Sequence, residues 1–181
     1  GYDDLRVHLG KDAPEEERSS TSYQPVVALF AMTLLMAIGA ASVAEGQWFT
    51  PRTVEWFVAF SMCGLAYLKL RDVESFSTMF LNYDLLARRW VPYGYFYPFG
   101  EAFAGVLMIP GGLFGLIAAP VALGIGTIGA VSVFKAVYID GRELECACVG
   151  GDSNVPLGFV SLTENLFMIG MGVWMLVKFG S

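Results

Sequence analysis

Two cysteines separated by a single residue, Cys146 and Cys148, are the strongest local sign of chemistry in this sequence. Glycines flank them at Gly141 and Gly150, which favours a loop. Two thiols this close can form a reversible disulfide or bind a soft metal ion together. A disulfide across so small a ring is strained and therefore easily reduced. The pair predicts redox or metal chemistry, and the alternative is two small loop residues without a special role.

The third cysteine, Cys63, lies in an apolar stretch and can be read in two ways. A free cysteine in a membrane helix usually serves as a small packing residue. Cys63 nevertheless lies toward the same side as the loop of Cys146 and Cys148, so a third thiol in a relay is the functional alternative.

A group of polar residues forms a second candidate site in or near the apolar segments. It comprises Asp84, Arg88, Glu101, Glu164 and Asn165. Ionisable side chains inside a membrane are costly and mark functional candidates. Pairing of carboxylates with arginine that locks helices together is one reading. A proton-handling or thiol-activating role is the other.

The elements that must position these residues are predicted to be membrane helices. Hydrophobic residues make up 55% of the 181 residues and charged residues 15%, with a mean hydropathy of +0.56. A soluble domain carries about 25% charged residues, so the solvent for this surface must be lipid. The net charge of −6 argues against a nucleic-acid partner, because phosphate binding needs clustered cations.

Stretches of roughly 20 apolar residues, the length that crosses a bilayer, predict an all-α integral membrane protein with a bundle of five transmembrane helices. The spans cover about 25–44, 53–70, 98–117, 119–138 and 157–177. The apolar stretch 98–138 would reach about 60 Å as one helix, twice the thickness of the hydrocarbon core. It must therefore fold back as a hairpin, and Ala118-Ala119-Pro120 is the predicted turn.

The segment between the second and third spans, 71–97, has a different pattern. Phe76, Phe80 and Tyr83 recur at helical spacing opposite charged residues. This pattern predicts an interfacial amphipathic helix on the membrane surface, followed by an aromatic belt over 90–97.

The distribution of Lys and Arg predicts a cytoplasmic N-terminus by the positive-inside rule. With five spans, nine cations would face the cytoplasm: Arg6, Lys11, Arg18, Lys69, Arg71, Arg88, Arg89, Lys135 and Arg142. Only Arg52 and Lys178 would face outward. Cys146 and Cys148 would then lie on the cytoplasmic side of a bacterial inner membrane.

The run CACVGGDSNVPLGFVSLTENLFMIGM (146–171) resembles the signature region of the MauE/DoxX superfamily of redox-associated membrane proteins. In that family a C-x-C-x-G-like loop precedes the last span, whose start carries an Asn; Cys146, Cys148, Gly150 and Asn165 match it. The stretch 69–101 also looks like the family's segment between its second and third spans. The resemblance covers about 45–180 and assigns 25–181 to a MauE/DoxX-like transmembrane domain.

The polar head and linker, 1–24, carries a second resemblance. Gly1-Tyr2-Asp3-Asp4-Leu5 looks like the end of the G-G-x-D-D-L motif of glutaredoxins. It suggests the remnant of a fused glutaredoxin domain, whose cofactor would be glutathione. The chain does not begin with Met, so we expect it to be processed or part of a longer protein.

These resemblances imply thiol–disulfide exchange, or the maturation of a partner, together with a cytoplasmic glutaredoxin. Because no second thiol pair lies on the outer side, a quinone or a partner protein would have to complete a transmembrane relay. Two alternatives stay open. One is an accessory structural subunit of a larger electron-transfer or photosynthetic membrane complex, and the other is a soft-metal carrier that uses Cys146 and Cys148.

Overall fold

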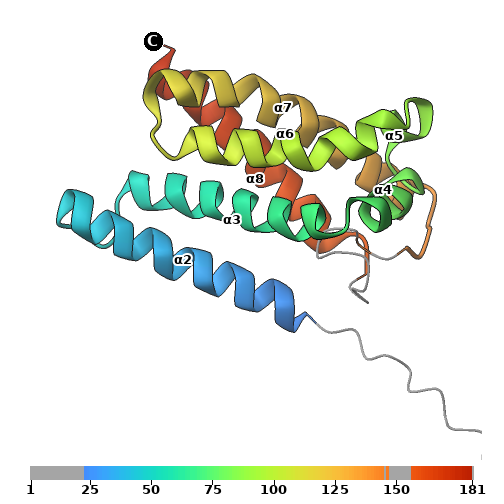
Figure 1. Cartoon of the computed structure of the whole chain (residues 1–181), viewed down its shortest axis with the longest axis horizontal. Coiled ribbons are helices and arrows are strands. Elements are labelled where there is room, and N and C mark those ends of the chain that lie inside the picture. Colours follow the sequence, from blue (N-terminus) through green and yellow to red (C-terminus); the bar gives the residue numbers. More distant parts are fainter. Residues whose placement is uncertain (1–22, 145, 147–155, 181) are drawn as a thin grey trace, which may run out of the picture.

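The computed structural model describes residues 23–144, 146 and 156–180, and in these ranges the chain forms a bundle of helices (Figure 1). Four of the helices are long and apolar enough to cross a membrane: α2 (Gln24–Glu45), α3 (Pro51–Arg71), α7 (Gly112–Phe134) extended by the π-helix η1 (Lys135–Ile139), and α8 (Phe159–Phe179). This confirms the all-α membrane class. The first, second and last predicted spans lie within two residues of α2, α3 and α8.

The third predicted span, 98–117, corresponds to α6 (Pro92–Met108), which is shorter than the other four helices, and the fourth, 119–138, falls on α7 and η1. At 1.5 Å per residue its 17 residues reach about 25 Å, slightly less than the hydrocarbon core. A count of five spans is therefore not established by helix length. Packing places α6 between α3 and α7 (Figure 1).

The hairpin between α6 and α7 exists, but the predicted turn at Ala118-Ala119-Pro120 is wrong. The chain reverses at Ile109–Gly111, and Pro120 lies inside α7. Gly111 and Gly112 adopt positive φ values of 71° and 56°, which glycine tolerates because it has no Cβ. Proline is tolerated inside membrane helices because neighbouring groups satisfy the freed backbone atoms. Pro110-Gly111-Gly112 was thus the stronger turn signal.

The predicted surface helix is also wrong in its form. Two short helices, α4 (Val73–Leu81) and α5 (Leu85–Arg89), replace it, because Asp84 interrupts the helix and caps α5. Its Oδ1 accepts hydrogen bonds from the N–H groups of Leu86 and Ala87, at 2.9 and 2.8 Å. Phe76 and Phe80 are 1% and 3% exposed, so the apolar face packs against protein and not against lipid.

Two arginines contact loops between helices at opposite ends of the bundle, and they serve to name these ends. At one end, Arg52 at the start of α3 donates to the carbonyl oxygens of Ile109 and Pro110 in the α6–α7 turn. At the other end, Arg142 after η1 donates to the Asn82 carbonyl between α4 and α5, over 2.7 Å. We call these the Arg52 end and the Arg142 end.

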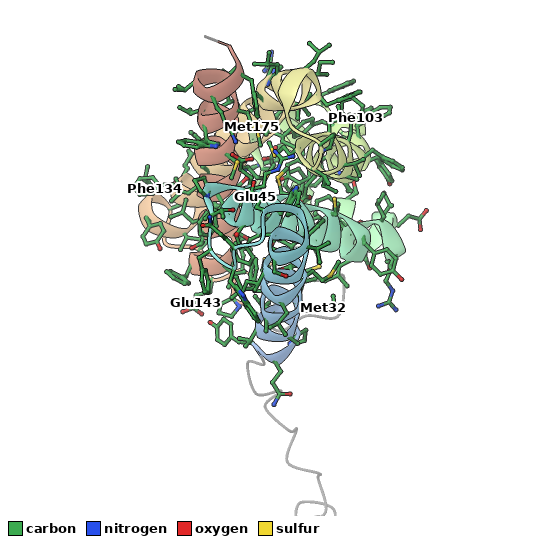
Figure 2. The ribbon with its side chains drawn as sticks, turned by 90° about the vertical axis from the view of Figure 1, so that its left-hand side faces the viewer. Met32, Glu45, Phe103, Phe134, Glu143 and Met175 are labelled. Atoms are coloured by element: carbon green, nitrogen blue, oxygen red, sulfur yellow. The ribbon has the colours of Figure 1, made fainter. Side chains whose placement is uncertain are left out.

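Large apolar side chains cover the outside of the bundle, and glycines lie at several contacts between the helices. Figure 2 shows Phe103, Phe134 and Met32 at the periphery, where each is at least 50% exposed, whereas Met175 lies inside and is fully buried. A surface of this kind is stable only against lipid, which agrees with membrane helices. Glycines allow close approach at the contacts between helices: a Cβ on Gly105 would lie 2.9 Å from the Cys63 Sγ atom.

Candidate functional site

The most unusual feature of the interior is a buried group of one lysine and two glutamates. The Lys69 Nζ atom lies 2.6 Å from Glu101 Oε2 and 2.5 Å from Glu164 Oε1. The three side chains come from α3, α6 and α8, and each is at most 5% exposed. We call them the triad. It joins three helices toward the Arg142 end of the bundle.

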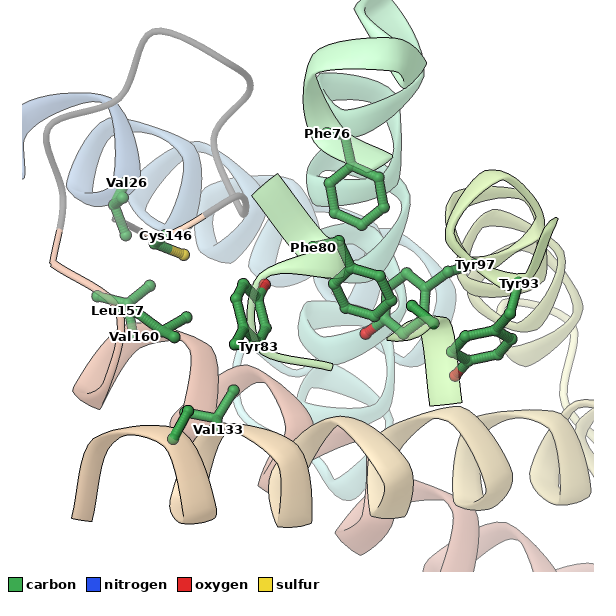
Figure 3. Packing of buried hydrophobic residues seen from close by; sticks show 12 residues of the cluster. Val26, Phe76, Phe80, Tyr83, Tyr93, Tyr97, Val133, Cys146, Leu157 and Val160 are labelled. Carbon is green, nitrogen blue, oxygen red and sulfur yellow. The ribbon is translucent and has the colours of Figure 1, made fainter. Parts of the chain in front are cut away.

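Aromatic rings surround the ammonium group of the triad. Lys69 Nζ lies 5.3 Å from the centre of the Tyr97 ring and 6.0 Å from that of Phe76, within the range of cation–π attraction. Phe76 in turn stacks with Phe80 and Tyr97, and the rings of Phe80 and Tyr97 pack at a tilt (Figure 3). The rings exclude water from the ions, which strengthens their mutual attraction and raises the cost of any unbalanced charge.

The charges of the triad do not balance if all three groups are ionised, because two carboxylates face one ammonium. One oxygen, Glu101 Oε1, is buried without a hydrogen-bond partner. An unpaired buried charge is costly, so the group is most stable when its two carboxyl groups hold one proton between them.

The predicted polar cluster is brought together only in part. Glu101 and Glu164 meet, but their cation is Lys69 and not Arg88, which lies exposed on α5. Asp84 is fully buried and acts as the cap of α5. Asn165 neighbours Glu164 on α8, where its Nδ2 donates to the Ser161 carbonyl over 2.7 Å and its amide fills the space above Gly129 of α7.

Lys69 was counted as a cation at a helix end, although a signal in the sequence pointed to its burial. Val58, Met62 and Leu65 occur at the helical spacing that marks one face of α3, and Lys69 continues that face. The three apolar residues are buried in the structure, and Lys69 is buried with them. A lysine in register with a buried apolar face predicts an internal partner of opposite charge.

Cys146 is disulfide-bonded and completely buried. It packs in a cluster with Val26, Leu157 and Val160, and its Sγ atom lies 3.0 Å from Ser161 Oγ (Figure 3). Since a disulfide sulfur carries no hydrogen, the Ser161 hydroxyl is the donor of this contact. Ser161 precedes Glu164 by three residues on α8, so the cysteine contacts the helix one turn from the triad.

Of the other two cysteines, the structure describes only Cys63. Cys148 and Gly150 lie outside the described residues. Cys63 is a free thiol on α3 that faces Gly105 of α6, which is a different packing environment from that of Cys146. A relay through Cys63 stays a prediction. In the described ranges no three His, Cys, Asp or Glu side chains gather as a metal site would require.

A second buried carboxylate, which the sequence reading did not select, lies at the Arg52 end. Glu55 on α3 accepts from Trp174 Nε1 and Lys178 Nζ of α8 at 2.7 and 2.6 Å, and from Arg52 at 3.1 Å. Here a single carboxylate faces two cations, so its charge is more than compensated. This group links α3 to α8 and provides a structural counterpart to the triad.

The fold and its buried ions define a multi-pass helical membrane protein with a polar interior toward one end. The family described as methylamine utilisation protein MauE matches residues 47–178. The chain therefore belongs to the MauE family. No curated protein and no solved structure is significantly similar to it.

Proposed function

We propose that the protein carries out thiol–disulfide exchange through Cys146, which lies toward the Arg142 end of the bundle, and Cys148. The observation that supports this best is the disulfide-bonded Cys146, buried beside Ser161 and one helical turn from the triad. A sulfur in this position lies close to the carboxyl groups of the triad, which can hold protons.

The reductant that we propose is a glutaredoxin-type thiol in the cytoplasm of a bacterium, with glutathione as its source of electrons. Support comes from the excess of Lys and Arg at the Arg142 end, which the positive-inside rule assigns to the cytoplasm. Lys135 and Arg142 lie there together with Arg71, whereas Arg52 and Lys178 lie at the other end. The proposed head resemblance to glutaredoxin falls on residues 1–22, outside the described ranges.

Membership in a family named for methylamine utilisation suggests that the exchange serves the maturation of a partner protein. Maturation of a secreted disulfide-containing subunit requires electrons to move between compartments. No described cysteine lies at the Arg52 end, so a quinone or the partner itself would continue the transfer.

The experiment is trapping of a mixed disulfide. Cys146→Ser should leave Cys148 able to form a stable mixed disulfide with glutathione or a glutaredoxin, which non-reducing mass spectrometry detects. Cys63→Ser serves as the control and should keep the intact disulfide. Thiols can also be alkylated in intact cells before the protein is isolated. If Cys146 and Cys148 are then always found as free thiols, the proposal is contradicted.

One structural observation favours a second function, that of an accessory subunit in a larger membrane complex. Helix α2 packs mainly on α3, and a groove of about 370 Å³ separates it from α8. Phe30, Phe57 and Phe167 line this groove. A partner helix or a lipid would cover it, and co-purification of a stable partner in mild detergent would support this alternative. The soft-metal alternative depends on Cys146 and Cys148 and stays a prediction.

A further inference from the structure

We infer that the Lys69–Glu101–Glu164 triad is a proton-binding site that supplies a proton, through the Ser161 hydroxyl, to the sulfur of Cys146 when its disulfide is reduced. This inference rests on the proposed function. It assigns to the triad a role in the reaction, in addition to its role in holding three helices together.

The sulfur of Cys146 needs a proton donor because of where it lies. Its side chain is fully buried in a cluster with Val26, Leu157 and Val160. A thiolate released there would be a buried charge among apolar side chains, which is strongly unfavourable. Reduction can proceed at this sulfur only if a proton arrives as the sulfur–sulfur bond breaks.

The triad can give up a proton at a lower cost. In its charge-balanced state one of its two carboxyl groups is protonated, because two carboxylates would otherwise face a single ammonium group. When that proton leaves, the new carboxylate still lies beside an ammonium group 2.5–2.6 Å away. The transfer therefore moves negative charge from an apolar cluster to a site that contains a cation.

Ser161 contacts the cysteine and lies one helical turn from the triad. Its Oγ lies 3.0 Å from Cys146 Sγ, and Glu164 follows three residues later on the same face of α8. Asn165 donates to the Ser161 carbonyl and so holds this turn of the helix in place.

Other titratable groups face this region from the linker between α4 and α5 and from α6, and they are poorer donors. Tyr83 and Tyr97 are phenols, which give up protons only at high pH. Asp84 uses Oδ1 to cap α5. Among the residues that the structure describes, only the triad combines two carboxyl groups with a compensating cation.

The step balances as follows. A thiolate reductant attacks the other sulfur of the disulfide, so a new sulfur–sulfur bond forms while the bond to Cys146 breaks. The electron pair of the broken bond goes to Cys146 Sγ, which takes the proton of the Ser161 hydroxyl. Ser161 is reprotonated from the Glu101–Glu164 pair, and the pair later regains its proton from water. The reductant is a low-molecular-weight thiol or a glutaredoxin thiolate.

The test measures the rate at which dithiothreitol reduces the disulfide of the full chain in lipid nanodiscs, between about pH 6.5 and 9. Rates are divided by the concentration of dithiothreitol thiolate at each pH. For the unsubstituted protein the corrected rate should stay constant. Glu164→Gln and Ser161→Ala should lower it by about 100-fold, the typical contribution of general-acid catalysis. The remaining rate should fall further as the pH rises, because the proton then comes from the solvent.

Matched controls separate this role from a purely structural one. Glu55→Gln changes a carboxylate of equal burial at the Arg52 end, and Ser61→Ala removes a buried hydroxyl that pairs with Thr33. Both should leave the corrected rate unchanged. Glu164→Asp, which keeps an acid, should restore part of the rate lost in Glu164→Gln.

The inference is overturned if the Ser161→Ala and Glu164→Gln variants are reduced at the same rate and with the same pH profile as the unsubstituted protein. That result would leave the proposed exchange intact. If dithiothreitol and glutaredoxin both fail to reduce the unsubstituted protein, the proposed function fails and the inference fails with it.

Discussion

At the scale of single residues, the interior contains more acid than base at the Arg142 end and more base than acid at the Arg52 end. Glu101 and Glu164 share Lys69, whereas Glu55 alone faces Arg52 and Lys178. Removing a partner from a buried pair leaves an uncompensated charge, which is why both groups constrain the helices that they join. The difference in balance is what makes the triad, and not Glu55, a holder of protons.

Asp84, which lies outside the membrane-spanning helices, illustrates how burial and capping oppose each other. Burial raises the pKa of its carboxyl group, and the hydrogen bond from the Ala87 N–H partly offsets this. Its Oδ2 atom has no partner. Folding thus makes ionisation of Asp84 less favourable than it is in the unfolded chain, although the cap itself needs only one oxygen acceptor.

We expect Asp84→Ala to lower the free energy of unfolding by about 1 kcal/mol, the usual loss for an N-cap. Asp84→Asn keeps the acceptor and removes the charge, so it should cost less. Because the folded pKa is raised, unsubstituted protein should gain stability as the pH falls through that pKa, and Asp84→Asn should lose this part of the pH dependence. Thermal unfolding in detergent at several pH values measures both effects. Equal losses in the Ala and Asn variants would contradict the capping role.

At the scale of elements, close contacts between helices depend on glycines at particular positions. Gly105 lets α6 approach α3, since a Cβ there would lie 2.9 Å from Cys63 Sγ and 3.1 Å from the Ala59 carbonyl oxygen. Backbone atoms cannot move aside as a flexible side chain can. The hairpin of α6 and α7 therefore packs on α3 at Gly105, where the absence of a Cβ leaves room for α3.

We expect Gly105→Ala to reduce the free energy of unfolding by about 1–3 kcal/mol, because overpacking separates the two helices. Gly124→Ala on α7 is the matched control: a Cβ there meets nothing within 4 Å, so the change should be neutral. Denaturation in mixed micelles compares the two variants. A loss at Gly124 as large as that at Gly105 would show that the close contact of Gly105 with α3 is not the cause, because alanine favours a helix more than glycine does.

At the scale of the whole molecule, the contacts at the two ends of the bundle predict that α6 crosses the bilayer in spite of its length. Arg52 joins the α2–α3 loop to the α6–α7 turn, and Arg142 joins the end of η1 to the α4–α5 linker. If α6 did not cross, segments that contact each other at one end of the bundle would have to lie on opposite sides of the membrane. Its length of about 25 Å is compatible with local thinning of the bilayer.

Cysteines introduced at Gln47, Pro110 and Glu143, in a Cys63→Ser background that keeps the disulfide, test this topology. Membrane-impermeant maleimide should label positions 47 and 110 from the periplasmic side and position 143 only after the cells are opened. All three side chains are exposed in the structure. Labelling of positions 47 and 110 from opposite sides would mean that α6 does not cross, and would reverse the assignment of Cys146 to the cytoplasm.

The sequence alone determined the membrane class and the positions of α2, α3 and α8, because the length of an apolar stretch is a local property that lipid selects directly. It also predicted Glu101, Glu164 and Cys146 as candidate functional residues. Only the tertiary structure decided which of them meet, because Lys69 and Glu164 are 95 residues apart and come together through the packing of three helices. The turn at Ile109–Gly111 and the burial of Phe76 and Phe80 were decided in the same way, by contacts between helices that no local pattern records.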